Sequence, residues 1–153
     1  MRILMVGTGY VGLVSGACFS DFGHDVVCLD KDAAKIEALR RGEIPIWEPG
    51  LDALVAANVK AGRLSFTTDL AEGAKGAEVI FIAVGTPSRR GDGFADLSYV
   101  FGAAREIAGV LDGFTVIVTK STVPVGTGDE VERTIRELRP DAAFAVVSNP
   151  EFL

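Results

Sequence analysis

Residues 2–12 read Arg-Ile-Leu-Met-Val-Gly-Thr-Gly-Tyr-Val-Gly, an apolar run that leads directly into three closely spaced glycines. A helical pattern and a second apolar run follow, and Asp30 ends that run 18 positions after Gly12. A strand, a glycine loop, a helix, a second strand and an acidic residue in this order form the dinucleotide-binding fingerprint in the context that it requires. The sequence therefore predicts a dinucleotide-binding βαβ unit at the start of the chain.

Each glycine of this loop has a physical task in such a unit. Gly7 permits the tight turn, Gly9 lets backbone amides approach a pyrophosphate, and Gly12 lets the helix pack closely on the strand. The N-terminus of the helix, at Tyr10 and Val11, then receives the phosphate charge. We expect these five residues to contact the cofactor.

Asp30 predicts which dinucleotide binds. Its carboxylate can accept hydrogen bonds from the hydroxyls of the adenine ribose and would repel a 2′-phosphate, so NAD is favoured over NADP or a flavin. Lys31 is a cation beside it that could soften that repulsion. Lys35, one helical turn further on, either reaches the edge of the ribose or lies on a solvated helix face.

The rest of the chain alternates apolar runs with amphipathic helical patterns. Near-continuous apolar runs are typical of strands covered on both faces, and alternation with helices indicates right-handed crossovers in a parallel sheet. We predict a doubly wound α/β domain of the Rossmann type with strand order 3-2-1-4-5-6. Its expected strands span residues 2–6, 25–29, 64–67, 79–84, 114–118 and 142–147, with helices over about 11–22, 51–60 and 97–111.

Composition limits the classes of function that remain. The 153 residues suit one domain, which we expect to be a cofactor-binding domain, and no apolar run reaches the ~20 residues of a membrane span. The net charge of −6 argues against nucleic acid or an anionic membrane surface as a partner. Two cysteines suit a reducing compartment, and the first strand starts directly after Met1, so we expect a cytoplasmic protein without a signal peptide.

Loops that follow the strands of such a sheet face one crevice, and here they carry polar residues. Gly85, Thr86 and Pro87 follow the fourth strand, where the chain passes close to the pyrophosphate or the nicotinamide ribose, or simply turns. Ser121 and Thr122 follow the fifth strand, and Thr122 could also cap a helix that begins near residue 124 or 125. Glu151 follows the sixth strand and is a candidate base in a cleft, or a solvated side chain. We expect five loops to converge on one cleft.

Other side chains that could be reactive are expected to have structural roles rather than roles in chemistry. Cys18 lies on the apolar stripe of the first helix and Cys28 inside the second strand, so both are expected to pack in the core. His24 follows Gly23 at a turn that ends the helix. The polar loop 89–93 is a candidate lid, interface or plain surface, and no metal-ligand spacing is found.

Five spaced motifs resemble a known family. They read Met-Val-Gly-Thr-Gly-Tyr-Val-Gly-Leu-Val at 5–14, Pro-Ile-Trp-Glu-Pro-Gly-Leu at 45–51, Val-Gly-Thr-Pro at 84–87, Lys-Ser-Thr-Val-Pro-Val-Gly-Thr at 120–127 and Ser-Asn-Pro-Glu-Phe-Leu at 148–153. Together they cover almost the whole chain and resemble the UDP-glucose/GDP-mannose dehydrogenases. Residues 85–93 and 95–99 make the bacterial UDP-glucose 6-dehydrogenases the closest likeness.

The resemblance implies an activity and roles for particular residues. Such enzymes oxidise the C6 alcohol of UDP-glucose to a carboxylate with two NAD. Thr122 and Glu151 are implied to help hold a catalytic water, and the segment of Glu151, Phe152 and Leu153 is implied to contact substrate. Cofactor contacts are implied for Val11, Asp30, Lys35, Thr86 and Thr122.

Length is where the chain departs from the family. Members carry a central helix and a second domain that supplies the catalytic cysteine, so residues 1–153 resemble the amino-terminal cofactor domain, expected to bind NAD without turnover. Members commonly dimerise through the central helix, so this domain alone is expected to be monomeric. Two alternatives stay open, namely the equivalent domain of a GDP-mannose or UDP-N-acetylmannosamine dehydrogenase, and a stand-alone NAD-sensing module.

Overall fold

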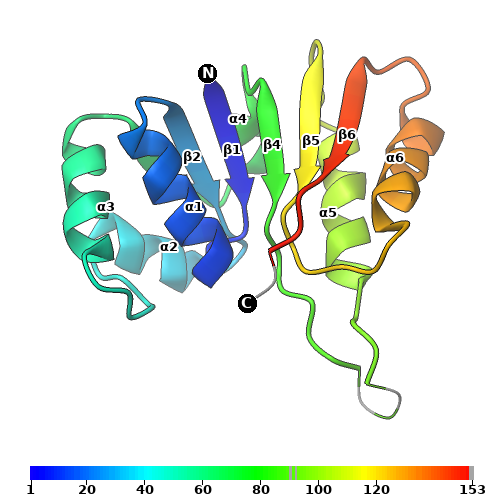
Figure 1. Ribbon diagram of the computed structural model, residues 1–153. Coiled ribbons are helices and arrows are strands. Elements are labelled where there is room, and N and C mark those ends of the chain that lie inside the picture. The colour runs from blue at the N-terminus through cyan, green and yellow to red at the C-terminus, as the bar shows by residue number, and fades with distance from the viewer. Residues whose placement is uncertain (90, 92, 152–153) are drawn as a thin grey trace.

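The apolar run at the start of the chain forms β1 (Arg2–Val6), which lies in the middle of a parallel sheet between β2 and β4. The computed structural model describes residues 1–89, 91 and 93–151. Every neighbouring pair of strands is parallel and the order is β3-β2-β1-β4-β5-β6, which confirms the predicted topology (Figure 1). The other strands are β2 (Asp25–Leu29), β3 (Leu64–Thr67), β4 (Val79–Ile82), β5 (Thr115–Thr119) and β6 (Phe144–Ser148).

Helices lie on both faces of the sheet, but they cover different strands on each face. Three of them lie over β1, β2 and β3 on the face turned to the viewer in Figure 1, and the others lie on the opposite face. The first group is α1 (Tyr10–Asp21), α2 (Ala33–Arg40) and α3 (Leu51–Lys60). The second group is α4 (Leu70–Ala74), α5 (Ser98–Ala108) and α6 (Thr127–Leu138).

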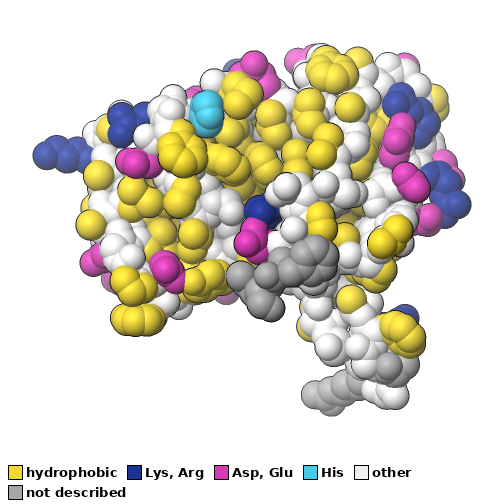
Figure 2. Space-filling model, in the orientation of Figure 1, with side chains coloured by type: hydrophobic (Ala, Val, Ile, Leu, Met, Phe, Trp, Pro, Cys, Tyr) yellow, Lys and Arg dark blue, Asp and Glu magenta, His cyan; other side chains and the backbone are white. Residues whose placement is uncertain are grey.

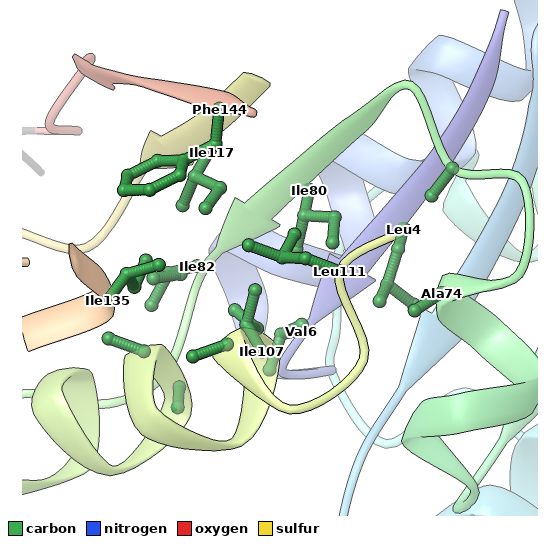
Figure 3. Close-up of a cluster of buried hydrophobic side chains, with 14 of the residues drawn as sticks. Leu4, Val6, Ala74, Ile80, Ile82, Ile107, Leu111, Ile117, Ile135 and Phe144 are labelled. Carbon is green, nitrogen blue, oxygen red and sulfur yellow. The ribbon is translucent and has the colours of Figure 1, made fainter. Parts of the chain in front are cut away.

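Side chains of β1 alternate between two apolar layers because successive residues of a strand point to opposite faces. Ile3 and Met5 pack with the α1 side, whereas Leu4 and Val6 pack with the side of α4, α5 and α6. Figure 3 shows the second layer, in which Ile80 and Ile82 of β4 also take part. Burying each such side chain contributes about 1.5–3 kcal/mol, so both layers hold the carboxyl ends of the strands in fixed positions.

Three of the predicted strands had boundaries that were wrong by one or two residues. β4 ends at Ile82 rather than at residue 84, because the Ile82 carbonyl accepts hydrogen bonds from the Lys120 and Ser121 amides and the chain then turns away. β5 begins at Thr115, since Phe114 is exposed after the turn at Gly113. β6 spans Phe144–Ser148 rather than 142–147, and its register against β5 pairs Phe144 with Thr115.

Candidate functional site at the carboxyl edge of the sheet

The glycine loop between β1 and α1 is held too tightly for any larger residue at two of its positions. Gly7 has a φ of +107°, and a Cβ there would lie 2.5 Å from the carbonyl oxygen of Ala83. A Cβ on Gly12 would lie 1.9 Å from the carbonyl oxygen of Gly7. Nothing lies within 4 Å of the equivalent position on Gly9, so the space above this residue is open. The loop therefore has the closed and open positions that a bound pyrophosphate requires.

Helix α1 points its first turn into this open space. Its N-cap residue is Gly9, and no side chain caps the free backbone N–H groups of the first turn. Uncapped amides and the positive end of the helix dipole attract an anion. This geometry fits the phosphate role predicted for the loop.

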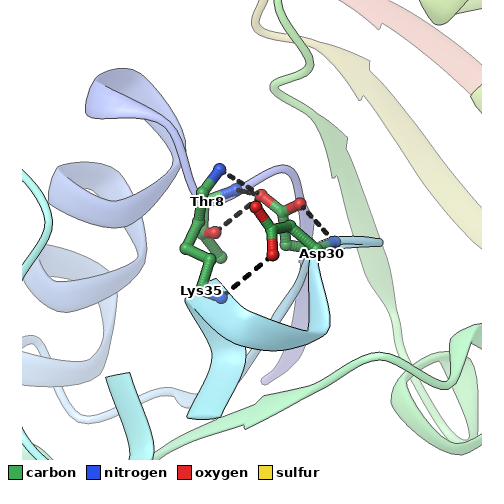
Figure 4. Close-up of polar contacts among 4 residues, drawn as sticks. Thr8, Asp30 and Lys35 are labelled. Carbon is green, nitrogen blue, oxygen red and sulfur yellow. Dashed lines mark hydrogen bonds and ion pairs between the residues drawn. The ribbon is translucent and has the colours of Figure 1, made fainter. Parts of the chain in front are cut away.

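Asp30 lies at the end of β2 and is bound from three directions (Figure 4). Its Oδ2 accepts hydrogen bonds from the backbone N–H of Thr8 at 3.0 Å and from the Thr8 hydroxyl at 2.7 Å. The same oxygen forms an ion pair with Lys35 Nζ at 3.0 Å, and Oδ1 accepts from the Asp32 amide at 3.1 Å. Lys35 is thus directed at Asp30 instead of pointing into solvent.

This arrangement keeps the Asp30 carboxylate ionised. Burial by itself raises the pKa, but the hydrogen bonds from Thr8, Asp32 and Lys35 outweigh it and lower the pKa from 3.8 to about 2. Three of these donors share Oδ2, whereas Oδ1 accepts only from the Asp32 amide, so Oδ1 retains an acceptor position for a ribose hydroxyl. The side chain is 16% exposed, which leaves that access open.

A cleft of about 680 Å³ opens beside Asp30. This volume lies within the range of roughly 300–1,000 Å³ that is usual for small-molecule sites. It runs between the loops after β1, β2 and β4 and one face of α5. Its lining includes Gly7, Gly9, Asp30, Lys31, Lys35, Gly85, Tyr99, Gly102 and Glu106.

The loops after β4, β5 and β6 are joined to one another further along the same edge. Thr86 Oγ1 donates to the Thr122 carbonyl at 3.1 Å, and Ser121 Oγ donates to the Val84 carbonyl at 2.7 Å. The Thr122 hydroxyl donates to the carbonyl of Glu151. The Glu151 carboxylate forms an ion pair with Lys120, whose side chain is 13% exposed. Thr122 is therefore in direct contact with the backbone of Glu151, and their joint role at a catalytic water stays a prediction.

A second, smaller hollow lies between α1 and this group. It has a volume of about 80 Å³ and is lined by Tyr10, Val11, Val14, Ser15 and Glu151. Val11 and Glu151 come from opposite ends of the chain, and the segment of Glu151 is held by backbone hydrogen bonds from Asn149 to Thr119 and from Glu151 to Lys120. The two hollows lie on either side of the glycine loop.

The five loops therefore meet along one edge but do not line one cleft. The large cleft takes residues from three of them, whereas the small hollow takes only Glu151 from a loop and its other lining residues from α1. Pro87 lines neither, and its carbonyl instead accepts from the Asp96 amide at 2.8 Å. The cap that was suggested for Thr122 was wrong, because α6 begins at Thr127 with Gly126 as its N-cap residue. Phe152 and Leu153 lie outside the described residues.

Sequence reasoning missed several residues of this site. Thr8 has no exposed surface and orients Asp30, yet it lies unremarked between two glycines. Lys120 belongs to the motif at 120–127, but no role was predicted for its side chain. On α5 the apolar stripe predicted only the face that packs in the core. Tyr99, Gly102 and Glu106 share another face at helical spacing and line the cleft. That spacing, with a glycine in the middle, was the available signal.

Of the two cysteines predicted to pack in the core, Cys28 does so, whereas the prediction for Cys18 was wrong, because its side chain on α1 is only partly buried. Cys28 is buried, and burial raises the pKa of its thiol to about 12, so it is neutral and unreactive. Gly23 has a φ of +93°, and the His24 amide donates to the carbonyl of Phe19 where α1 ends. Among the described residues, no three His, Cys, Asp or Glu side chains form a group that could hold a metal ion.

Comparison with known proteins agrees with this geometry. The model of the NAD binding domain of the UDP-glucose/GDP-mannose dehydrogenase family matches residues 1–153. The chain belongs to this family. Its NAD-binding domain is 72% identical over 153 residues to the UDP-glucose 6-dehydrogenase of Rhizobium meliloti (strain 1021), covering the whole chain and 35% of that protein. It is 49% identical to the UDP-glucose 6-dehydrogenase of Pseudomonas aeruginosa, covering 34% of it.

Solved structures of the family have the same fold. The crystal structure of a ternary complex of GDP-mannose dehydrogenase from Pseudomonas aeruginosa superposes with a TM-score of 0.94 at 39% identity, over the whole chain and 36% of that protein. A UDP-glucose dehydrogenase from Pyrobaculum islandicum gives a TM-score of 0.93 at 41% identity, over 99% of the chain and 36% of that protein. The UDP-glucose/GDP-mannose dehydrogenase domain described here spans about a third of the length of its relatives. Within its described residues, no helix is long and apolar enough to cross a membrane.

Proposed function

We propose that this domain binds NAD across the glycine loop, with the adenosine in the large cleft and the nicotinamide toward the small hollow. The observation that carries the proposal is the ionised Asp30, held by Thr8 and Lys35 beside an open Gly9. Asp30 would accept hydrogen bonds from the ribose hydroxyls, and the uncapped amides of α1 would hold the pyrophosphate. Val11 would then contact the nicotinamide end.

We further propose that the protein containing this domain oxidises the C6 alcohol of UDP-glucose to a carboxylate with two NAD. Support comes from the 72% identical relative, which is a UDP-glucose 6-dehydrogenase. Bound NAD supplies the chemistry of hydride acceptance. Thr122 and Glu151 would position a water for the second oxidation, and Lys120 would fix the Glu151 carboxylate through their ion pair. Substrate contacts by Glu151, Phe152 and Leu153 complete this assignment.

The cellular compartment, the oligomeric state and the partners of the protein are part of the same proposal. We assign it to the cytoplasm, where Cys18 and Cys28, both unpaired, would stay reduced. The full-length protein is proposed to be a homodimer through regions beyond residue 153, and the isolated domain a monomer. Nucleic acid is not among the proposed partners, because the net charge of −6 provides no electrostatic attraction to it.

Calorimetric titration of NAD and NADP into residues 1–153 tests the cofactor assignment, with circular dichroism to confirm folding. Saturable NAD binding that weakens on Asp30→Ala, and no turnover, is the expected result. A folded domain that binds neither nucleotide contradicts the proposal.

The substrate assignment needs the full-length protein. Rates of NAD reduction with UDP-glucose, GDP-mannose and UDP-N-acetylmannosamine would be compared at equal concentration. We expect UDP-glucose to give the highest kcat/KM. A preference for either of the other two would replace the substrate in this proposal, and no turnover with any would favour a module that only senses NAD.

A further inference from the structure

Two cations flank the position where a 2′-phosphate would lie, although Asp30 marks a site for NAD. Lys31 follows Asp30 directly, and Lys35 lies one helical turn later, and both line the large cleft. A cation beside the ribose is the feature by which related folds accommodate NADP. Asp30 carries one negative charge against these two positive charges, so by itself it leaves the ribose end of the cleft with an excess positive charge.

Each of the two lysines has its own carboxylate partner. Lys35 Nζ is bound to Asp30, whereas Lys31 Nζ forms an ion pair at 2.5 Å with Oε1 of Glu106. Glu106 comes from α5, 75 residues further along the chain, and reaches across the cleft to Lys31. The four side chains at this end of the cleft are therefore electrically balanced, and Lys31 is directed at Glu106 of α5.

We propose that Glu106 is a specificity-determining residue that excludes the 2′-phosphate of NADP by neutralising and withdrawing Lys31. This inference rests on the proposed binding of NAD in the cleft. NAD carries hydroxyls at the ribose and is little affected by the pairing of Lys31. A 2′-phosphate brings a charge between −1 and −2, which Glu106 repels directly and which an unpaired Lys31 would attract.

The pair is partly exposed, with 75% and 45% of the two side chains accessible, so water and salt screen it. Its effect on NADP is accordingly moderate. For Glu106→Gln we expect the affinity for NADP relative to NAD to rise about three- to tenfold at low ionic strength. Glu106→Asp, which keeps the charge, is expected to restore most of the discrimination against NADP.

The experiment measures the dissociation constants of NAD and NADP by calorimetry on the protein, at low salt and in 0.5 M salt, where the Debye length falls to roughly 4 Å. Adenosine 2′,5′-bisphosphate and 5′-AMP serve as shorter probes of the adenosine end. Adding Lys31→Gln to Glu106→Gln is expected to abolish the gain, since no free cation then remains beside Asp30. Glu137→Gln is the matched control, because it removes the same charge from α6, outside the cleft.

The outcomes separate this inference from the proposed function. If the unmodified protein does not bind NAD, both are wrong. If it binds NAD but Glu106→Gln changes the ratio of the NADP and NAD constants no more than Glu137→Gln does, Glu106 has no part in specificity. A gain that persists in the double variant would also overturn the role assigned to Lys31.

Discussion

At the scale of single residues, Asp30 contributes to both binding and folding. Its folded-state pKa, about 2, lies below the unfolded value of 3.8, so its ionisation stabilises the fold above about pH 4, and that stability is lost as the pH falls through about 2. The side chain is largely buried, and a lowering of this size corresponds to about 2 kcal/mol at neutral pH.

We therefore expect Asp30→Asn to unfold at lower urea concentration than the unmodified domain at pH 7, with the difference shrinking between pH 4 and pH 2. The same substitution removes a ribose acceptor and should weaken NAD binding at least tenfold. Asp141→Asn, at a side chain that is 79% exposed, serves as the control and should change neither property. A stability difference that does not depend on pH would show that the carboxylate charge is not the cause.

Lys120 pairs with Glu151, and we expect it to act through that carboxylate. A charge-assisted hydrogen bond of this kind contributes about 1.5–3 kcal/mol, so Lys120→Met in the full-length protein should lower kcat about 10- to 100-fold and leave the NAD dissociation constant within about twofold. Lys120→Arg keeps the charge and should recover most of the loss. Steady-state kinetics with separate kcat and KM values check this, and an unchanged kcat in the methionine variant would remove Lys120 from the site.

At the scale of elements, two glycines where the glycine loop meets α1 are expected to have different roles, one in folding and the other in binding NAD. Gly12→Ala places a methyl group 1.9 Å from a backbone oxygen, so α1 must move and we expect a loss of about 1–3 kcal/mol in unfolding free energy. Gly9→Ala meets no atom within 4 Å and has a φ of −71° that alanine adopts freely. It should fold normally and lose NAD affinity, because its methyl group would occupy the space for the pyrophosphate.

Thermal unfolding and NAD titration of both glycine variants provide the check. Equal loss of stability in the two variants would contradict the geometry of the loop. Normal NAD affinity in a folded Gly9→Ala protein would mean that the phosphates lie elsewhere.

Helix α5 offers a second test, in which stability and binding are expected to change in opposite directions. Gly102 lines the cleft from the middle of the helix, with nothing within 4 Å of its Cβ position. Leucine favours a helix over glycine by up to about 1 kcal/mol, so Gly102→Leu should raise the melting temperature while its side chain fills part of the adenosine site. NAD affinity should fall at least tenfold, and unchanged affinity would place the adenine outside this cleft.

At the scale of the whole molecule, the helices leave one half of the sheet open on one face. Over β4, β5 and β6 no described helix covers the side that carries α1 (Figure 1), and hydrophobic side chains gather there in Figure 2. Phe81 stacks on Phe19 of α1 at a ring distance of 5.1 Å, while Val147 on β6 is 46% exposed. The proposed NAD site lies at the carboxyl edge, where the strands are held by apolar packing on both faces in the β1 region.

Binding of NAD at that edge should stabilise the whole molecule by linkage. At a NAD concentration 100 times the dissociation constant, the expected gain is about 2.7 kcal/mol, which corresponds to a rise of roughly 5–11 °C in melting temperature for a domain of this size. Differential scanning calorimetry at several NAD concentrations checks this, with Asp30→Ala as the control that should shift far less. A melting temperature independent of NAD would contradict binding to the folded state.

The fold and half of the site were predictable because local sequence specifies them. The glycine spacing, the apolar runs and Asp30 are each readable within about 30 residues, and they were sufficient for the strand order, while the pyrophosphate and ribose positions stay predictions. Strand ends were less well predicted, since the end of β4 depends on amides of the loop after β5.

By itself, the sequence determined that this chain builds a parallel sheet with a dinucleotide site at its first turn, because hydrophobic period and glycine position act over short distances. Only the tertiary structure decided that Thr8 and Lys35 both bind Asp30, that Lys120 pairs with Glu151, and that Glu106 reaches Lys31. The last two pairs join residues 31 and 75 positions apart, respectively. Contacts of that separation depend on the order of strands and on which helix face lines the cleft, and neither is encoded in any single stretch of sequence.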